Sequence, residues 1–489
     1  MKKNIVVIGS GFSSLSAACY LAKAGNNVTI VEKNETAGGR ARQFKVSGFT
    51  FDMGPSWYWM PDVFDQFFNA FGKSTKDYYD LIRLDPSYRV KFKNDEMNLP
   101  ATMSELENLF ESIEKGSAIK LREFLKQAKY KYEVGINDLV HKPSRSLTEF
   151  MDSRLLYGLL KMDVFTSMSK HVRRFFKDER LIQLMEFPVL FLGATPENTP
   201  ALYSLMNYAD LSLGTWYPMG GMHKIVEGMV SLATELGVTF RFNEKVIELQ
   251  TQSKKINAVI TDKDSIACDV VVGGADYNHI EQEILAPEYR MYTPDYWNKR
   301  TMAPSSLIFY IGLNTKLPNM MHHVLFFDED FKLHAEEIYE NPQWPTNPLI
   351  YASVTSITDD SVAPEGHENL FILIPVAPNL EDTEEVRQRY FELVADKLQK
   401  YTGVDIRNHL VYKRSYAHED FISDYNSYKG NAYGLANTLR QTAILKPAMK
   451  NKKLDNLYFT GQLTVPGPGV PPSIISGEVV AKEIEKDFK

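Results

Sequence analysis

Residues 4–42, NIVVIGSGFSSLSAACYLAKAGNNVTIVEKNETAGGRAR, decide the fold of this chain. Within them the short apolar run 5–8 predicts a buried parallel strand, and 13–24 predicts the helix that follows it. Gly9 and Gly11 stand in the turn between the two, where glycine lets the chain turn tightly and lets backbone N–H groups approach a pyrophosphate. The phosphates would then lie at the positive end of the helix. The segment therefore predicts a Rossmann-like dinucleotide site in an α/β fold.

A second predicted strand, 28–31, carries an acidic side chain to the same site. Glu32 follows Gly11 by about 20 residues, the separation at which a carboxylate binds the ribose hydroxyls. We count Lys33, directly after it, among the cofactor-binding candidates. Ser14 takes the third position of the G-x-G-x-x-G pattern, and its small side chain still lets helix and strand pack closely. An acid at Glu32 disfavours the 2′-phosphate of NADP.

The residues after Glu32 favour FAD over NAD. Gly38, Gly39 and Arg40 predict another turn that faces phosphate, and residues 52–56, DMGPS, form a second turn with a glycine. The GG-R-x-R run resembles the FAD-dependent amine oxidase superfamily, in which it lies along the cofactor. The resemblance implies contacts to FAD from the first turn, and we add Gly54, Pro55 and Ser56 from the second. The alternative is a surface loop with solvated arginines.

Composition bounds the function. The chain has 489 residues, 44% hydrophobic and 24% charged, which is typical of a globular protein with a large core. Its net charge of −7 argues against a nucleic-acid partner, for which a basic domain is expected. Cys19, Cys268 and the pair His322-His323 lack metal-ligand spacing, so we predict no metal. The two cysteines indicate small buried residues in a reducing compartment.

No secretion signal and no membrane-spanning helix are predicted. The N-terminal run carries two lysines and is uncharged to residue 22, but Gly9 and Gly11 interrupt it after a short apolar stretch. No other segment has about 18 consecutive apolar residues.

The predicted fold is α/β, with a discontinuous Rossmann-like FAD-binding domain and two excursions from it. Segments 1–80, 213–290 and 431–489 are predicted to form the FAD-binding domain. Segment 81–212 is predicted as a helical region that contacts substrate or membrane, because apolar residues recur there at helical spacing. Segment 291–430 is predicted as a substrate domain of mixed sheet plus helices, since runs such as SSLIFYIGL and LFILIPVA suit a covered sheet.

The C-terminal piece predicts a second cofactor-facing turn. A strand at 457–460 ends at Gly461, a loop rich in glycine and proline follows, and 474–484 predicts a helix. Backbone donors before that helix would face phosphate or flavin, so the candidates are Gly461, Gln462, Gly469 and Val470. The alternative is a plain linker.

The chain resembles the carotenoid desaturases, specifically the bacterial phytoene desaturase (phytoene dehydrogenase) family. The similarity is carried over nearly the full length by the N-terminal motif, FDMGPSWYWMP, GTWYPMGGM, GADYNH and LYFTGQLTVPGPGVPPSIISG. It implies FAD-dependent conversion of phytoene to lycopene by successive dehydrogenations, with hydride passing from an allylic C–H bond to flavin. Reoxidation by oxygen or a quinone is implied too. In this family the strand at 245–247 pairs its backbone with the adenine, which implies a role for Val246.

A C40 hydrocarbon substrate implies a cytoplasmic protein that is peripherally associated with the inner face of the cell membrane. The stretch Leu147 to Phe176 clusters Leu, Met and Phe near basic residues, and could be an interfacial helix. An ordinary amphipathic helix that covers the core is the alternative.

Three aromatic residues and two acids are further candidates. Trp57, Tyr58 and Trp59 could line a polyene tunnel or pack in the core. Glu186 and Asp276 could accept protons, although a structural role is favoured for each, and no catalytic residue is assigned.

The sequence is also compatible with other functions. Within the family they are a hydroxycarotenoid 3,4-desaturase, an isomerase and a C30 diapophytoene desaturase, although the run Trp57 to Trp59 looks like the branch that acts on phytoene. Outside it they are an amine or porphyrinogen oxidase and a non-catalytic prenyl-lipid carrier. The intact glycines and Glu32 argue against the carrier, which would not need a full FAD site.

Overall fold

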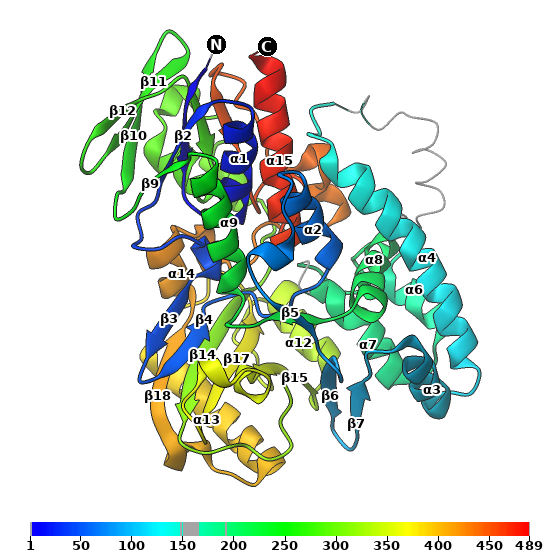
Figure 1. Cartoon of the computed structure of the whole chain (residues 1–489). Helices are drawn as coiled ribbons and strands as arrows, with labels where there is room; N and C mark the ends of the chain where they lie inside the picture. The colour runs from blue at the N-terminus through cyan, green and yellow to red at the C-terminus, as the bar shows by residue number, and fades with distance from the viewer. Residues whose placement is uncertain (1, 147–148, 150–165, 191–192, 489) are drawn as a thin grey trace.

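The computed structural model describes residues 2–146, 149, 166–190 and 193–488 (Figure 1). Its centre is a parallel five-stranded sheet in the order β19-β13-β1-β2-β9, in agreement with the predicted α/β class. The strands come from both ends and the middle of the chain: β1 (Asn4–Ile8), β2 (Asn27–Val31), β9 (Thr239–Arg241), β13 (Val270–Gly273) and β19 (Leu457–Phe459).

The two faces of this sheet are covered differently because the side chains of β1 alternate. Ile5 and Val7 pack in a core formed with the helices α1 (Phe12–Lys23), α9 (His223–Glu235) and α15 (Val470–Asp487). Val6 and Ile8 face a second core, against the antiparallel sheet of β10 (Val246–Gln252), β11 (Lys255–Thr261) and β12 (Ser265–Ala267).

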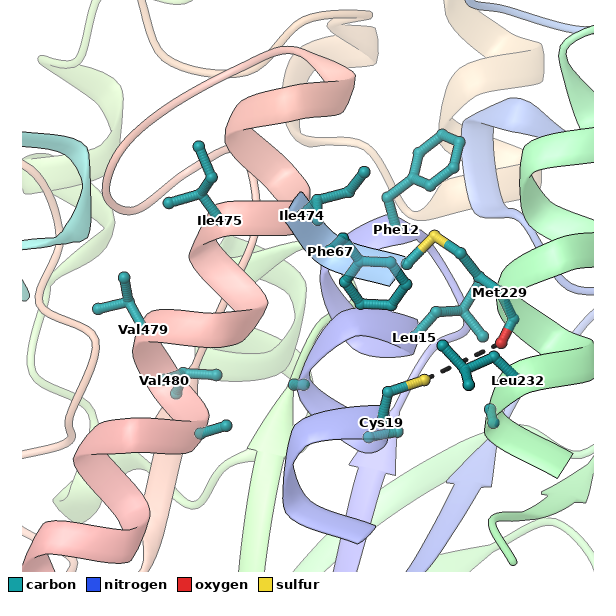
Figure 2. Close-up of a cluster of buried hydrophobic side chains, with 14 of the residues drawn as sticks. Phe12, Leu15, Cys19, Phe67, Met229, Leu232, Ile474, Ile475, Val479 and Val480 are labelled. Atoms are coloured by element: carbon teal, nitrogen blue, oxygen red, sulfur yellow. Dashed lines mark hydrogen bonds between the residues drawn. The ribbon is translucent and has the colours of Figure 1, made fainter. Parts of the chain in front are cut away.

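Helix α1 lies between α15 and α9. Figure 2 shows Leu15 and Cys19 of α1 between Val480 of α15 and Leu232 of α9. Burial of each such aliphatic side chain contributes about 2 kcal/mol. Close approach of α1 and α15 depends on Gly477, because a Cβ there would overlap the Ser13 carbonyl and stand 2.6 Å from Cβ of Ser16. Both helices follow parallel strands, so both begin at the carboxyl edge of the sheet.

A larger sheet forms the second layer of the molecule, in the order β18-β14-β17-β16-β15-β6-β7. Its strands are β6 (Tyr88–Phe92), β7 (Glu96–Leu99), β14 (Ser305–Leu313), β15 (His323–Phe327), β16 (Ile350–Ser353), β17 (Glu368–Val376) and β18 (Leu410–Tyr416). One face packs on α13 (Glu384–Thr402). The other faces the helical region, and α12 (Phe331–Tyr339) lies beside it.

The helical region is composed mainly of α3 (Met103–Ile113), α4 (Ser117–Asn137), α6 (Met168–Phe175), α7 (Glu179–Leu190) and α8 (Leu205–Tyr208) (Figure 1). The segment predicted to be helical also contributes β6 and β7 to the large sheet, and β5 (Leu81–Arg83) pairs with β8 (Trp216–Pro218). One further antiparallel ribbon is formed by β3 (Gln43–Val46) and β4 (Phe49–Asp52). Four short helices are α2 (Pro61–Asn69), α10 (Tyr277–His279), α11 (Pro294–Asn298) and α14 (His418–Tyr425).

The candidate membrane stretch is described only in part. Residues 147–148 and 150–165 lie outside the described residues, so that prediction is not tested there. Its end forms α6, with Met168, His171 and Val172 buried and with Arg173 and Arg174 in the last turn. In the described part of the chain, no helix is both long and apolar enough to cross a bilayer.

Candidate cofactor and substrate site

The first glycines form a turn over the N-terminus of α1. Gly9 has a φ of +89°, which a side chain would strain, and its N–H donates to the Val31 carbonyl at 2.8 Å. Gly11 is the N-cap of α1, and a Cβ there would meet no atom of the described residues within 4 Å. The described residues therefore leave the space over Gly11 open for a phosphate.

Ser14 fills the place of the third glycine by packing against another glycine. Its side chain is fully buried, and a Cβ at Gly274 on the neighbouring turn would overlap its Oγ. The Oγ has no hydrogen-bond partner among the described residues. The small residue thus keeps helix and strand close, as expected.

Glu32 lies at the end of β2, where the sequence places it. Its Oε2 accepts from the N–H and the hydroxyl of Ser10 at 2.9 and 2.7 Å, and its Oε1 accepts from Asn34 N at 2.9 Å. The carboxylate is 5% exposed, beside the turn that carries Gly9 and Gly11. Lys33 turns away from it and donates to the Ser423 carbonyl at 2.7 Å.

The predicted turn at Gly38 and Gly39 packs against the turn at Gly9 and Gly11. Gly38 N donates to the Ser10 carbonyl at 2.9 Å, and a Cβ at Gly39 would lie 3.3 Å from Cα of Gly11. Gly54 packs on the backbone of Arg40, where a Cβ would overlap the carbonyl oxygen. The turn at Gly38 and Gly39 is therefore in direct contact with both the turn at Gly11 and the turn at Gly54.

The Arg40 guanidinium is buried between the N-terminal and C-terminal pieces of the chain. Its Nη2 donates to Ser427 Oγ at 2.9 Å and to the Asn431 carbonyl at 3.3 Å. With its amide oxygen turned toward Arg40, Gln462 accepts from Nη2 at 3.0 Å and from Nη1 at 3.2 Å. The Nε has no partner among the described residues. Burial lowers the pKa of Arg40, and the nearby Asp276 carboxylate opposes that shift.

Asp276 has a structural role in this arrangement. Its carboxylate accepts from the backbone N–H groups of His279 and Tyr428, each at 3.2 Å. Burial raises its pKa, while Arg40 and these backbone bonds lower it. The carboxylate thus caps a helix and holds a loop beside Arg40, which fits the structural interpretation.

The C-terminal turn lies against α1. Gly461 N donates to Ser476 Oγ at 3.0 Å, and a Cβ at Gly461 would stand 3.1 Å from Ser13 Oγ. Gly469 is the N-cap of α15, and Val470 is its first residue, four residues earlier than predicted. The N-termini of α1 and α15 therefore meet at one edge of the sheet.

Val246 lies in a hydrophobic core, and the two residues after Gly54 lie beside a small cavity. Val246 is buried at the start of β10 in the core that also holds Val31, next to Glu32. Pro55 and Ser56 line a small cavity between β4 and the large sheet. Its wall includes Asp52, which accepts from the backbone N–H groups of Met222 and His223 at the start of α9.

The arrangement fits a bound FAD. An open space over Gly11 and a buried Arg40 Nε that has no partner among the described residues lie along the first helix and its adjoining turn. Buried polar atoms in native proteins normally have partners, so the Arg40 Nε indicates a ligand that would supply one. Two helix N-termini add the positive field that a pyrophosphate prefers.

A cavity lies on the face of the large sheet toward the helical region. It is lined almost wholly by apolar side chains, among them Phe187, Leu325, Phe327, Phe331, Leu349 and Tyr351. Such a lining suits a hydrocarbon chain and excludes water.

The three aromatic candidates all pack in or against the hydrophobic cores. Tyr58 is fully buried, stacks on Phe64 at 4.3 Å and bonds to the Tyr79 hydroxyl, so it belongs to the core. Trp57 lies instead among rings near the cavity, with its centroid 6.4 Å from that of Phe187. Trp59 packs beside Trp57 at 5.1 Å, and its indole N–H donates to Thr215.

Two buried carboxyl groups, those of Glu186 and Asp210, lie in the helical region. Burial raises the pKa of Glu186 to about 7, opposed by Ser169 and by Arg173, whose Nε lies 4.0 Å away. Burial also raises the pKa of Asp210 to about 7, although it accepts from Tyr88 Oη at 2.6 Å. Sequence reasoning missed Asp210 because no motif marks an acid that folding buries.

Comparison with known proteins places this site in a family. Residues 12–485 match the family described as flavin containing amine oxidoreductase. Three curated relatives are similar over 99% of this chain. A carotenoid 3,4-desaturase of Haloarcula japonica is 42% identical and is covered over 99% of its length. A zeta-carotene-forming phytoene desaturase of Myxococcus xanthus and a 4,4'-diapophytoene desaturase of Staphylococcus aureus are each 31% identical, covered over 94% and 99%.

Solved structures show the same fold at low identity. An oxidoreductase from Methanosarcina mazei superposes with a TM-score of 0.63 at 15% identity, over 98% of this chain and 100% of that one. Rab GDI from Plasmodium falciparum superposes with a TM-score of 0.56 at 12% identity, over 99% and 98%. These likenesses establish the fold alone.

The chain belongs to the flavin-containing amine oxidoreductase family, and the flavin is FAD. Within that family it groups with the carotenoid desaturases, as the sequence motifs predict. It is therefore a flavin-dependent oxidoreductase.

Proposed function

We propose that this enzyme removes hydrogen from a saturated C–C bond beside the polyene of a carotenoid, and that the bond is at the 3,4 position. The observation that carries the proposal is the 42% identity, over 99% of both chains, to a carotenoid 3,4-desaturase. Identity to the phytoene and diapophytoene desaturases is 31%. The difference supports 3,4-desaturation over the two other carotenoid reactions considered.

Conversion of phytoene to lycopene is the second candidate. It is supported by the run Gly54 to Trp59, GPSWYW, which looks like the branch that acts on phytoene. Both reactions would use the same site, and they would differ in how far the carotenoid extends along the cavity.

The chain's own residues would hold the cofactor and keep the reacting bond dry. The turns at Gly11, Gly39 and Gly469 would present backbone N–H groups to it, and Arg40 with Gln462 would fix the adjoining loop. When bound, FAD would supply the acceptor for a hydride from an allylic carbon, and loss of a proton from the adjacent carbon would complete the new double bond. The apolar cavity would orient the polyene and exclude water, as this chemistry needs.

Two partners follow from this proposal. A carotenoid dissolves in the bilayer, so the enzyme would need peripheral contact with a membrane to load its substrate. Oxygen or a quinone would restore the oxidised flavin.

The test is a reconstitution of the FAD-loaded protein in liposomes that contain a single carotenoid. Phytoene, a C30 diapophytoene and a carotenoid whose polyene is already complete up to a saturated 3,4 bond are supplied separately, and products are separated by chromatography. We expect the 3,4-saturated carotenoid to gain one double bond only when FAD is present. Preferred conversion of phytoene would transfer the assignment to the second candidate. No conversion of any polyene would contradict both.

A further inference from the structure

A lysine and an asparagine converge on the loop that precedes α15. A Cβ at Gly467 would stand 3.2 Å from Lys446 Nζ and 3.1 Å from Asn437 Oδ1, so both side chains point at the same place. Both residues are buried, at 5% and 6% exposed. We name these two residues the lysine–asparagine pair.

Neither polar group of the pair is satisfied by the protein. Lys446 Nζ and Asn437 Oδ1 have no hydrogen-bond partner among the described residues, although the first is a donor and the second an acceptor. A buried ammonium or amide without a partner is costly, and native structures normally supply one. The pair therefore indicates a ligand that accepts from the lysine and donates to the asparagine.

The pair lies beside the start of α15. Gly467 stands two residues before Gly469, the N-cap of that helix, and α15 begins at the same edge of the sheet as α1. The first turn of α15 offers few backbone donors. Pro471 and Pro472 have no N–H, and the N–H of Ser473 donates to the Gly469 carbonyl at 3.0 Å. A ligand at this helix end would therefore take its charged hydrogen bond from the lysine of the pair.

One short segment connects the pair to the substrate cavity. Tyr433 lines the cavity, and a Cβ at Gly434 would stand 3.0 Å from Gln462 of the C-terminal cofactor turn. Asn437 follows three residues later. Segment 433–437 thus runs from the cavity wall, past that turn, to the pair. A flavin ring that takes hydride from a chain in the cavity would lie in this region.

The hydrogen-bonding groups of the pair fit a flavin ring better than a phosphate. Phosphate oxygens are acceptors, so a phosphate here would leave Asn437 Oδ1 unpaired. The pyrimidine edge of flavin carries one N–H between two carbonyl groups. This edge can donate to Asn437 Oδ1 and accept from Lys446 Nζ at the same time.

Charge is the second reason to place the flavin ring here. A hydride brings two electrons and one proton, so its transfer to oxidised flavin adds one negative charge to the ring. Burial lowers the pKa of Lys446 to about 7, and no charged side chain among the described residues offsets that shift. Negative charge on the ring would supply the counter-charge that the ammonium lacks.

We propose that the lysine–asparagine pair binds the pyrimidine edge of the flavin, and that the Lys446 ammonium raises the reduction potential of bound FAD. Asn437 binds the ring in both oxidation states, because the N–H of the pyrimidine edge keeps its proton on reduction. Lys446 binds the reduced ring more tightly than the oxidised ring. This inference goes beyond the proposed function, since it concerns the cofactor and holds for either candidate substrate.

The first test separates the flavin ring from the rest of FAD. Apoprotein is titrated by calorimetry at pH 7 with FAD and with ADP, which carries the adenosine and the pyrophosphate without the flavin. We expect Lys446→Met and Asn437→Leu to bind FAD at least about fivefold more weakly, and to bind ADP as the natural protein does. Glu32→Ala is the contrast, because loss of the ribose contact should weaken the binding of both ligands.

The second test measures the reduction potential of the FAD-loaded protein in the absence of any carotenoid. Lys446→Met should lose at least about tenfold in its preference for reduced over oxidised flavin, which lowers the midpoint potential by about 30 mV for a two-electron couple. Asn437→Leu should leave the potential near that of the natural protein. Lys450→Met is the matched control: it removes the same charge where Lys450 pairs with Asp487 at the surface, and it should leave the potential unchanged.

The outcomes that would overturn the inference are distinct. An unchanged potential in folded, FAD-loaded Lys446→Met would overturn the effect of the ammonium. Equal weakening of ADP and FAD binding would overturn the contact to the flavin ring, because the pair would then bind the pyrophosphate. Flavin absorbance and thermal unfolding verify the fold of each variant. Should Lys446→Met fail to fold, Asn437→Leu still tests the contact, and unchanged FAD affinity in that variant would overturn it.

These measurements are independent of the proposed function because neither uses a carotenoid. Failure of the pair to affect FAD would leave the desaturase reaction standing. Failure of the reconstitution to convert any polyene would leave the role of the pair standing.

Discussion

Replacement of Gly11 by alanine should separate cofactor binding from folding. A Cβ at Gly11 would meet no atom of the described residues within 4 Å, and the Gly11 φ of −71° is one that alanine adopts readily. The N-cap position slightly disfavours alanine, while reduced freedom of the unfolded chain acts in the opposite direction. The apoprotein should therefore change in stability by less than about 1 kcal/mol.

The holoprotein should behave differently, because the open space over Gly11 is where a pyrophosphate would approach. A phosphate oxygen bonds to an N–H at about 2.9 Å, which the new methyl group would obstruct. Loss of one hydrogen bond to a charged group costs about 1.5–3 kcal/mol. This corresponds to roughly 10- to 150-fold weaker binding of FAD.

The assay is titration of apoprotein with FAD by flavin fluorescence, with thermal unfolding of the same samples. Gly9→Ala is the matched control: its φ of +89° strains any side chain, so it should destabilise the apoprotein itself by about 1–2 kcal/mol. Unchanged FAD affinity in Gly11→Ala would refute the placement of the phosphates.

Three further predictions concern packing, the ribose contact and pH. Gly477→Ala should lower the stability of the apoprotein by about 1–3 kcal/mol, because the new Cβ would overlap the Ser13 carbonyl. Urea unfolding measures this change, and an unchanged midpoint would count against the tight α1–α15 contact. Glu32→Ala should weaken FAD binding by titration while the hydride step of fully loaded enzyme stays normal, and unchanged affinity would contradict the nucleotide placement. Lys446 is buried without a partner among the described residues, and burial lowers its pKa to about 7. Between about pH 7 and 10 the unfolded chain holds a proton that the folded chain lacks, so the stability of the apoprotein should rise with pH there. Lys446→Met should flatten that rise in thermal melts, and an unaltered slope would show that another group causes it.

The local N-terminal pattern could be predicted because each of its parts has one physical reason. The order of strand, glycine turn, helix, strand and acid is read correctly, and the structure places Gly11, Gly39 and Gly54 together. The start of the last helix was predicted less accurately. The sequence predicts a helix from residue 474, but α15 starts at Val470, because the prolines that follow Val470 are acceptable in the first turn of a helix.

The polar groups of the interior could not be predicted in the same way. β15 has only five residues, so its strand and the placement of His323 beside Tyr351 depend on pairing with β6 and β16. Asp210 and Lys446 look like surface residues in sequence, and only the packing of distant segments buries them. Burial of an ionisable group is a tertiary property that no short motif records.

The most direct test of the central claim is a single turnover without oxygen. FAD-loaded protein is mixed with a carotenoid in liposomes, and flavin absorbance and polyene absorbance are followed in the same sample. We expect the flavin band to bleach in the same kinetic phase in which the polyene band moves to longer wavelength. A flavin band that stays unchanged with every carotenoid, while the protein is folded and loaded, would contradict a flavin-dependent desaturation.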